Sequence, residues 1–272
     1  MNFIADVVAD MLSKPPTQTE HLEIFREAAS DIRFEEVNLF TLNHDRLLEN
    51  FLRYRDIGVV DGFEKENALG IRTWNPALFD CWRTHTTGPA VRLFKLHGSI
   101  DWRRFRPWES HGHQTTSNPW REEYVGIRAN PALANANDEQ GRAHKELDRA
   151  LFLAGTFNKM LTYLNHVFLE LHYRFHRTLA ETTQLVVCGY GFGDKGINNR
   201  ITDWMCLPTG RGKRRIILIE PRPLEDVRQS SRGAIAGKLE SWKEDGRLVH
   251  FQSPIGGPNV TWKAISTTLL GG

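Results

Sequence analysis

The sequence predicts an α/β protein with a doubly wound, Rossmann-like and mostly parallel sheet that also carries helical and loop insertions. Short continuous apolar runs, such as residues 185–188 and 216–219, alternate with segments of helical periodicity. A strand that is buried on both faces loses the apolar–polar alternation that one wet face would produce. These runs therefore indicate a parallel sheet with helices on both faces.

The N-terminal residues predict two helices. Residues 2–12 have an amphipathic pattern that ends at Pro15 and Pro16, which cannot continue a helix. Thr17 and Glu20 then have the spacing of a capping box at the start of a second helix. The apolar residues at helical spacing in this second helix are Leu22, Phe25, Ala29 and Ile32.

Two strands in the first half of the chain are expected to be buried. Residues 37–42 form an apolar run that is followed by a helical pattern over 46–54, and residues 91–96 form a mostly apolar strand that ends at His97. Two further stretches, 55–90 and 103–160, contain many glycines, prolines and polar residues. We interpret them as insertions or lid-like segments, with one strand at 123–127.

The second half of the chain alternates helices and strands more regularly. The expected elements, in chain order, are a helix at 161–181, a strand at 185–188, a glycine-rich turn at 189–196, a helix at 197–206, strands at 216–219 and 248–251, and a helix at 260–270.

The composition is that of a globular protein. A chain of 272 residues with 40% hydrophobic content can form a single domain over residues 1–272. Its 35 basic and 33 acidic side chains give a net charge of +2, which does not indicate nucleic-acid binding. The 3 cysteines cannot build a disulfide framework or a four-cysteine zinc module. Without a secretory signal or a membrane-spanning apolar run, we expect a cytoplasmic protein that has no membrane association.

Polar residues follow four of the predicted strands. Asn43 and Asp45 follow the first, His97 the second, the glycine run the third and Glu220 the fourth. Ligands of open α/β sheets bind beyond the carboxyl ends of the strands, so the sequence predicts one shared site at these ends. The alternative for His97 is a hydrogen-bonded structural histidine, and the alternative for Asn43 and Asp45 is a helix cap at the start of 46–54.

The glycine run has the form G-x-G-x-x-G, with Gly191, Gly193 and Gly196 at the glycine positions. It follows a predicted strand and opens a predicted helix, as a dinucleotide-binding turn does, and Glu220 could accept hydrogen bonds from ribose hydroxyls. Asp194 would place a negative charge near a phosphate, so contact with a ribose is the preferred assignment. The alternative is a glycine-rich turn without a ligand.

Three motifs in this order resemble the SIR2-like domain, the sirtuin-related NAD-consuming fold. The motifs are T-L-N-H-D-R-L-L-E at 41–49, K-L-H-G-S-I-D-W at 95–102, and G-Y-G-F-G-D at 189–194 with Asn198. The chain is most similar to the bacterial branch found in antiphage defence proteins. The resemblance implies hydrolysis of NAD to nicotinamide and ADP-ribose, with NAD as substrate and with a homo-oligomer or a defence-system protein as partner.

The same resemblance implies roles for individual residues. His97, Asn43 and Asp45 would be catalytic, with His97 as the base that acts on a ribose hydroxyl or on water. The residues implied to bind NAD are Thr41, Gly189, Gly191, Gly193, Asp194, Asn198 and Glu220. No metal site is expected, because the paired histidines lack a carboxylate or thiol at ligand spacing.

Two departures from the family pattern leave other functions open. The zinc cysteines of sirtuin deacylases are absent, which argues against an NAD-dependent protein deacylase. The glycine-rich loop that opens the family domain is also absent before Val37, so we expect a SIR2-like domain that is incomplete at its N-terminus. The principal alternative to hydrolysis is therefore a noncatalytic nucleotide-binding or assembly module.

Overall fold

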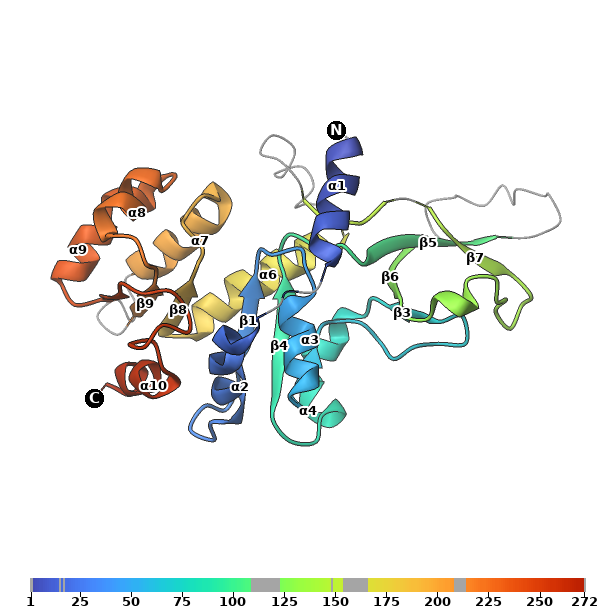
Figure 1. The fold of residues 1–272 in the computed structure, drawn as a ribbon, viewed down its shortest axis with the longest axis horizontal. Coiled ribbons are helices and arrows are strands. Elements are labelled where there is room, and N and C mark those ends of the chain that lie inside the picture. The colour runs from blue at the N-terminus through green and yellow to red at the C-terminus, as the bar shows by residue number, and fades with distance from the viewer. Residues whose placement is uncertain are drawn as a thin grey trace. The chain divides into compact units, whose positions relative to one another are not determined.

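The structure is a computed structural model that describes residues 2–14, 16, 18–108, 123–147, 149–153, 166–207 and 214–271 (Figure 1). The chain divides into two compact units. The first unit comprises Met1–Thr17 and Ala29–His172, and the second comprises Gln18–Ala28 and Tyr173–Gly272. Thr17, on which the expected capping box depends, lies outside the described residues.

The first unit contains a three-stranded parallel sheet with the order β1-β4-β2. Its strands are β1 (Asn38–Thr41), β4 (Ala90–Lys95) and β2 (Gly58–Val60). The central strand β4 is almost fully buried, which explains its apolar run. Helix α3 (Leu47–Tyr54) follows β1, so the predicted strand–helix succession is confirmed. The register pairs Thr41 with Lys95, and the carboxyl ends of β1 and β4 therefore lie side by side.

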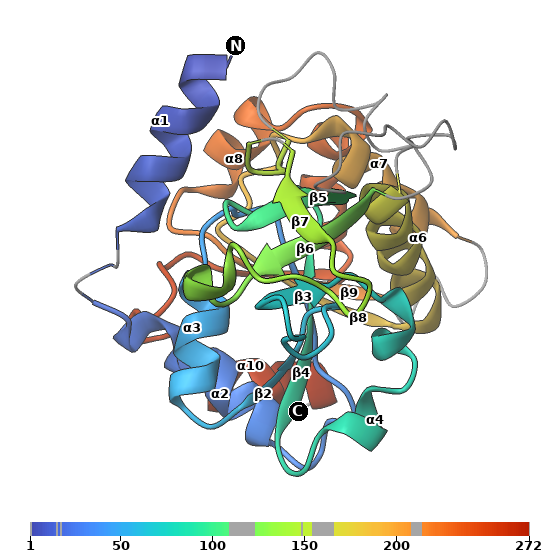
Figure 2. The same ribbon diagram turned by 90° about the vertical axis from the view of Figure 1, so that its right-hand side faces the viewer.

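A four-stranded antiparallel sheet also belongs to the first unit (Figure 2). Its order is β3 (Ile71–Thr73), β6 (Tyr124–Arg128), β5 (Trp102–Trp108) and β7 (Ala143–Glu146). Strand β6 confirms the strand expected at 123–127, whereas the other three lie in segments that we had interpreted as loop-rich. The three arginines of β5 hide its apolar positions from the sequence pattern, although Phe105 is buried in the core of this sheet.

Shorter elements complete the first unit. They are the helix α1 (Asn2–Ser13), the 3₁₀ helices η2 (Pro76–Phe79) and η4 (Pro131–Leu133), and the helix α4 (Trp82–His85). Helix α6 (His166–Glu181) contains the boundary between the units at His172 and Tyr173. Its position confirms the described part of the helix expected at 161–181.

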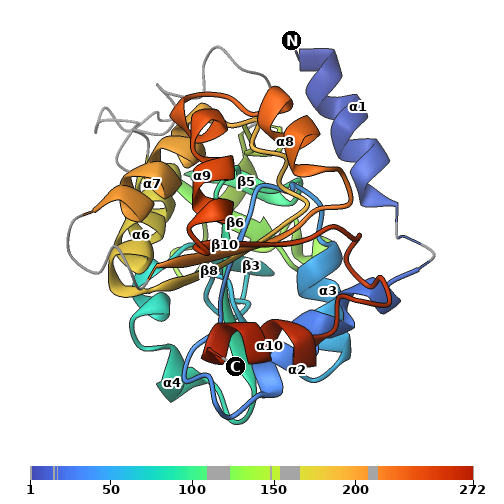
Figure 3. The same cartoon turned by 90° about the vertical axis from the view of Figure 1, so that its left-hand side faces the viewer.

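The second unit is built on a three-stranded parallel sheet with the order β10-β9-β8. The strands are β8 (Gln184–Cys188), β9 (Arg215–Ile219) and β10 (Leu248–Phe251). Helices α7 (Lys195–Cys206), α8 (Leu224–Ser230) and α9 (Leu239–Glu244) lie on one face, and α10 (Trp262–Leu270) lies on the other (Figure 3). The predicted α/β class with parallel sheets is confirmed, while a single doubly wound sheet remains a prediction.

An N-terminal segment contributes to the core of this second unit. Ile24, in helix α2 (Glu23–Ser30), packs against a cluster that includes Ile217 and Ile219 of β9 and Ile265 of α10. The expectation that Ile32 belongs to the apolar face of this helix is wrong. Helix α2 ends at Ser30, and Ile32 is 99% exposed.

Within the described part of the chain, we find no helix that combines the length and the apolar character needed to span a bilayer.

Candidate functional site

The turns that follow β1 and β4 are joined by hydrogen bonds. The backbone N–H of Ile100 and the hydroxyl of Ser99 donate to the carbonyl oxygen of His44, at 2.9 and 3.1 Å. The imidazole rings of His44 and His97 have centroids 6.1 Å apart. The structure therefore brings the turn that carries Asn43 and Asp45 next to the turn that carries His97.

Thr41 fixes the beginning of the first turn. Its hydroxyl oxygen accepts a hydrogen bond from the backbone N–H of Asn43 at 3.1 Å, and its carbonyl oxygen accepts one from Leu96 at 2.9 Å. The side chain of Thr41 thus shapes the turn on which Asn43 lies, and its backbone ties this turn to the end of β4.

His97 is held by a tightly packed backbone. It is 5% exposed, and its carbonyl oxygen accepts a hydrogen bond from the N–H of Leu153 at 2.8 Å. Gly98 has φ +78°, and a Cβ atom there would lie 2.3 Å from the carbonyl oxygen of Leu151. Only glycine fits this position, because it tolerates both the left-handed backbone and the close approach of Leu151.

Asp45 lies one residue before Arg46, the N-cap position of helix α3, and its carboxylate holds the start of this helix. Its carboxylate accepts a hydrogen bond from the backbone N–H of Leu47 at 2.9 Å. The buried Lys95 donates to the carbonyl oxygen of Asp45 and, at 2.8 Å, to the carboxylate of Glu49. Burial raises the pKa of Glu49 despite the opposing effect of Lys95. The sequence does not predict this ion pair; its signals are a lysine at the end of a mostly apolar strand and the place of both residues in the motifs at 41–49 and 95–102.

The predicted glycine run forms the turn between β8 and α7 in the second unit. Gly189 and Gly191 have φ +61° and +63°, and Phe192, which is buried, has φ +53°. A Cβ atom at Gly189 or Gly193 would meet nothing within 4 Å. The turn therefore needs glycine for its backbone conformation at 189 and 191, and its surface is open at 189 and 193.

Asp194 and Asn198 both act within this turn. The carboxylate of Asp194 caps α7 by accepting hydrogen bonds from Gly196 N–H at 2.9 Å and Ile197 N–H at 3.3 Å. Asn198 is 0% exposed, and its amide donates to the carbonyl oxygens of Phe192 and Arg232, both at 2.7 Å. Its Oδ1 atom lies 2.8 Å from the hydroxyl of Tyr190. Asn198 therefore holds the turn from the inside.

Glu220, at the end of β9, is buried and forms an ion pair with Arg222. The hydrogen bonds from Arg222 lower the pKa of Glu220. Burial, together with the charge of Glu220, raises the pKa of Cys188 to about 11. The sequence predicts Glu220 as a site residue but does not indicate that Arg222 pairs with it.

A model of the SIR2-like domain family matches residues 37–243, which is more than half of the chain. The chain belongs to the SIR2-like domain family. SIR2-like domains have NAD-related functions, and every predicted site residue lies within the matched range. No curated protein matches the chain.

The two units carry different parts of the SIR2-like motifs. Thr41, Asn43, Asp45 and His97 lie in the first unit, while the glycine turn, Asn198 and Glu220 lie in the second. Among the described residues of this SIR2-like chain, no group of three or more His, Cys, Asp or Glu side chains could hold a metal ion. The histidines at 111 and 113 lie outside that part of the chain.

Proposed function

We propose that this SIR2-like protein hydrolyses NAD to nicotinamide and ADP-ribose. The observation that carries the proposal is the hydrogen-bonded contact between the turn of Asn43 and Asp45 and the turn of His97. This contact gathers an amide, a carboxylate and an imidazole at adjacent strand ends, where ligands of α/β sheets bind.

The proposed reaction breaks the bond between the nicotinamide nitrogen and C1′ of the ribose. A water oxygen forms the new bond to C1′, and the proton released from this water passes to His97. Asn43 orients the nicotinamide ribose or carboxamide, and Asp45 holds the turn through its hydrogen bond with the backbone N–H of Leu47, the first residue of α3. Thr41 supports the same turn through its hydrogen bond with Asn43.

We assign the adenosine side of NAD to the glycine turn and the end of β9. Gly189 and Gly193 keep the backbone accessible to a ribose, Gly191 supplies the left-handed backbone of the turn, and Asp194 shapes the turn by capping α7. Asn198 and Glu220 complete this group. Asn198 stabilises the turn and does not contact the ligand itself, because its side-chain amide donates to backbone carbonyl oxygens of the protein.

Nicotinamide release from NAD by the purified protein tests the proposal. We expect turnover by the wild type and a loss of roughly 100-fold or more in His97→Ala, as is typical when a general base is removed. His144→Ala is the matched control, because His144 lies in β7 and contacts Tyr124 and Asp138 instead. Turnover that is unchanged in His97→Ala, or absent in every wild-type preparation, would contradict the proposal.

A noncatalytic nucleotide-binding or assembly module is the second candidate. It is favoured because three of the predicted site residues have structural tasks: Asp45 bonds the start of α3, Asp194 caps α7, and Asn198 makes internal hydrogen bonds. Calorimetry separates the two candidates. A noncatalytic module would bind NAD weakly or not at all, or would bind ADP-ribose, and would release no nicotinamide.

We further propose that the hydrolysis serves antiphage defence in bacterial cytoplasm, in a homo-oligomer or with a partner protein of the same defence system. Infection of cells that express either the wild type or His97→Ala tests this setting. We expect the wild type alone to lower cellular NAD and phage yield after infection. Equal phage yields in the two strains would contradict a defence role.

A further inference from the structure

We propose that Arg222 binds a phosphate group of the nucleotide, so that the second unit selects its ligand by phosphate rather than by ribose hydroxyls. The inference rests on the proposed function for the identity of the ligand as a dinucleotide. Its evidence comes from the second unit alone, where Arg222 lies between Glu220 and the glycine turn.

Most of the hydrogen-bond acceptor capacity of Glu220 is used by Arg222. One carboxylate oxygen accepts hydrogen bonds from Nε and the backbone N–H of Arg222, at 2.8 and 3.2 Å. The other oxygen accepts a hydrogen bond from Nη2 at 3.2 Å. Arg222 thus occupies three of the roughly four lone pairs of this carboxylate in a charge-assisted, bidentate arrangement, which leaves at most one for a ribose hydroxyl.

Arg222 is oriented by these contacts and remains accessible. Its Nη1 donates to the hydroxyl oxygen of Ser230 at 3.1 Å, and its side chain is 42% exposed. A guanidinium carries two N–H groups on each Nη atom, so Nη1 and Nη2 each keep one donor beyond the bonds to Ser230 and Glu220. A planar pair of donors on a fixed cation suits the oxygens of a phosphate.

Gly191 brings the guanidinium close to the glycine turn. A Cβ atom at Gly191 would lie 3.3 Å from Nη2 of Arg222, which is tighter than an ordinary contact. The glycine therefore allows Arg222 to approach the backbone of the turn that is assigned to the nucleotide.

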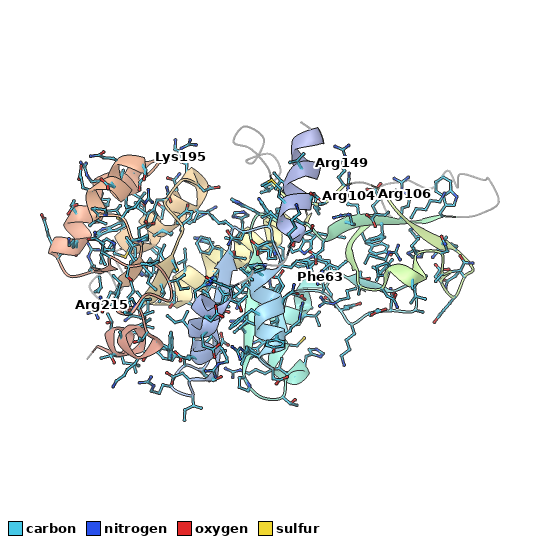
Figure 4. The ribbon with its side chains drawn as sticks, in the orientation of Figure 1. Phe63, Arg104, Arg106, Arg149, Lys195 and Arg215 are labelled. Carbon is cyan, nitrogen blue, oxygen red and sulfur yellow. The ribbon has the colours of Figure 1, made fainter. Side chains whose placement is uncertain are left out.

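Other charges around the turn favour an anionic ligand. Lys195 is exposed at the start of α7 (Figure 4). Arg232 is exposed as well, and its backbone N–H donates to the carbonyl oxygen of Phe192 at 3.0 Å. Of the nearby acids, Asp194 is engaged by backbone N–H groups and Glu220 by Arg222, while the exposed Asp226 also acts on Arg222 through its charge.

The N-terminus of α7 does not supply this phosphate site. The carboxylate of Asp194 already accepts hydrogen bonds from the N–H groups of Gly196 and Ile197, so these donors are not directed at a ligand. Arg222 is therefore the group on which the selection depends.

Titration calorimetry with NAD, NADP and ADP-ribose tests the proposal, with nicotinamide release measured separately. We expect Arg222→Gln to weaken binding roughly 10- to 100-fold, the effect of losing hydrogen bonds to a charged group. A larger loss for NADP assigns Arg222 to the 2′-phosphate, and equal losses assign it to the diphosphate. Arg228→Gln is the matched control, because Arg228 is also exposed and pairs with Glu225 on α8.

Arg222→Gln leaves the buried Glu220 without its cation and could unfold the unit. The double variant Glu220→Gln with Arg222→Gln removes both charges, and thermal unfolding checks that it is folded. The same 10- to 100-fold loss in a folded double variant supports the proposal, and unchanged affinity for all three nucleotides overturns it. If the affinity is unchanged and the protein still cleaves NAD, the phosphate role of Arg222 is refuted but the proposed hydrolysis is not. If binding depends on Arg222 but no nicotinamide is released, the proposed hydrolysis is refuted but the phosphate role is not.

Discussion

Lys95 and Glu49 form an ion pair with side chains only 3% and 8% exposed, near the turns of the candidate site. We expect Lys95→Met to destabilise the protein by about 3–5 kcal/mol, because it leaves a buried carboxylate without its partner. The double variant Lys95→Met with Glu49→Leu should recover most of this loss. Urea unfolding measures both, and a double variant as unstable as the single one would contradict the explanation.

The raised pKa of Cys188 has a chemical consequence. The thiolate is the form that reacts with alkylating reagents, and a pKa of about 11 keeps Cys188 protonated at pH 8. We expect its alkylation to remain slow at pH 8 and to accelerate as the pH rises toward 11. Mass spectrometry of peptides from iodoacetamide-treated protein measures this rate, with the exposed Cys206 as reference. Rapid modification of Cys188 in folded protein at pH 8 would refute the expectation.

Single residues show what a sequence pattern can and cannot reveal about the candidate site. His97 and Glu220 could be identified because each directly follows an apolar run. Arg222 and Lys95 could not be assigned a role, because an ion pair depends on how the backbone turns after the strand. Periodicity reports which positions are buried but does not identify the partner of a buried charge.

The turn after β4 requires a residue without a side chain at position 98. We expect Gly98→Ala to cost roughly 1–3 kcal/mol from the left-handed backbone, with a further loss from the contact with Leu151. Gly141→Ala is the matched control, because Gly141 has φ +74° but nothing near its Cβ position. Urea unfolding compares the two, and equal losses would show that the contact with Leu151 is unimportant.

Five of the six strands of the two parallel sheets could be predicted, whereas β2 and most of the antiparallel sheet lie in segments interpreted as insertions. Strands β4 and β9 contain apolar runs because they are the buried central strands of their sheets. The expectation that the strand at 37–42 is buried is wrong, because β1 is only half-buried, and in β8 only Val187 is buried. Strand β5 contains Arg103, Arg104 and Arg106, so its sequence resembles a polar loop. Its pairing with β6 and β7 depends on residues far along the chain, which local propensity does not describe.

The division of the chain into units assigns Ile24 to a core formed mainly by the C-terminal part. We expect Ile24→Ala to destabilise the second unit by about 1–2 kcal/mol, because this side chain is partly buried there. Hydrogen exchange should accelerate in β9 and remain unchanged in β4. Ile32→Ala is the control, because Ile32 is exposed and belongs to the first unit. Faster exchange in β4 than in β9 would contradict the assignment.

The sequence predicts an amphipathic helix with Leu22, Phe25, Ala29 and Ile32 on its apolar face, but it indicates neither Ile24 as the core contact nor the core that receives the helix. An apolar stripe specifies that a helix packs against something, and many surfaces in an α/β protein satisfy that need. The choice between the two units depends on the shape of the surface formed by β9 and α10, whose residues lie far along the chain.

This discontinuous unit also constrains how the protein is made. The ribosome synthesises Ile24 long before α10 (Trp262–Leu270), the helix that covers the same face of the sheet. At a translation rate of roughly 5–20 residues per second, α10 is synthesised on the order of tens of seconds after the apolar side of α2. During translation this segment is therefore an exposed site for chaperones, and the second unit can complete its core only after α10 has left the ribosome.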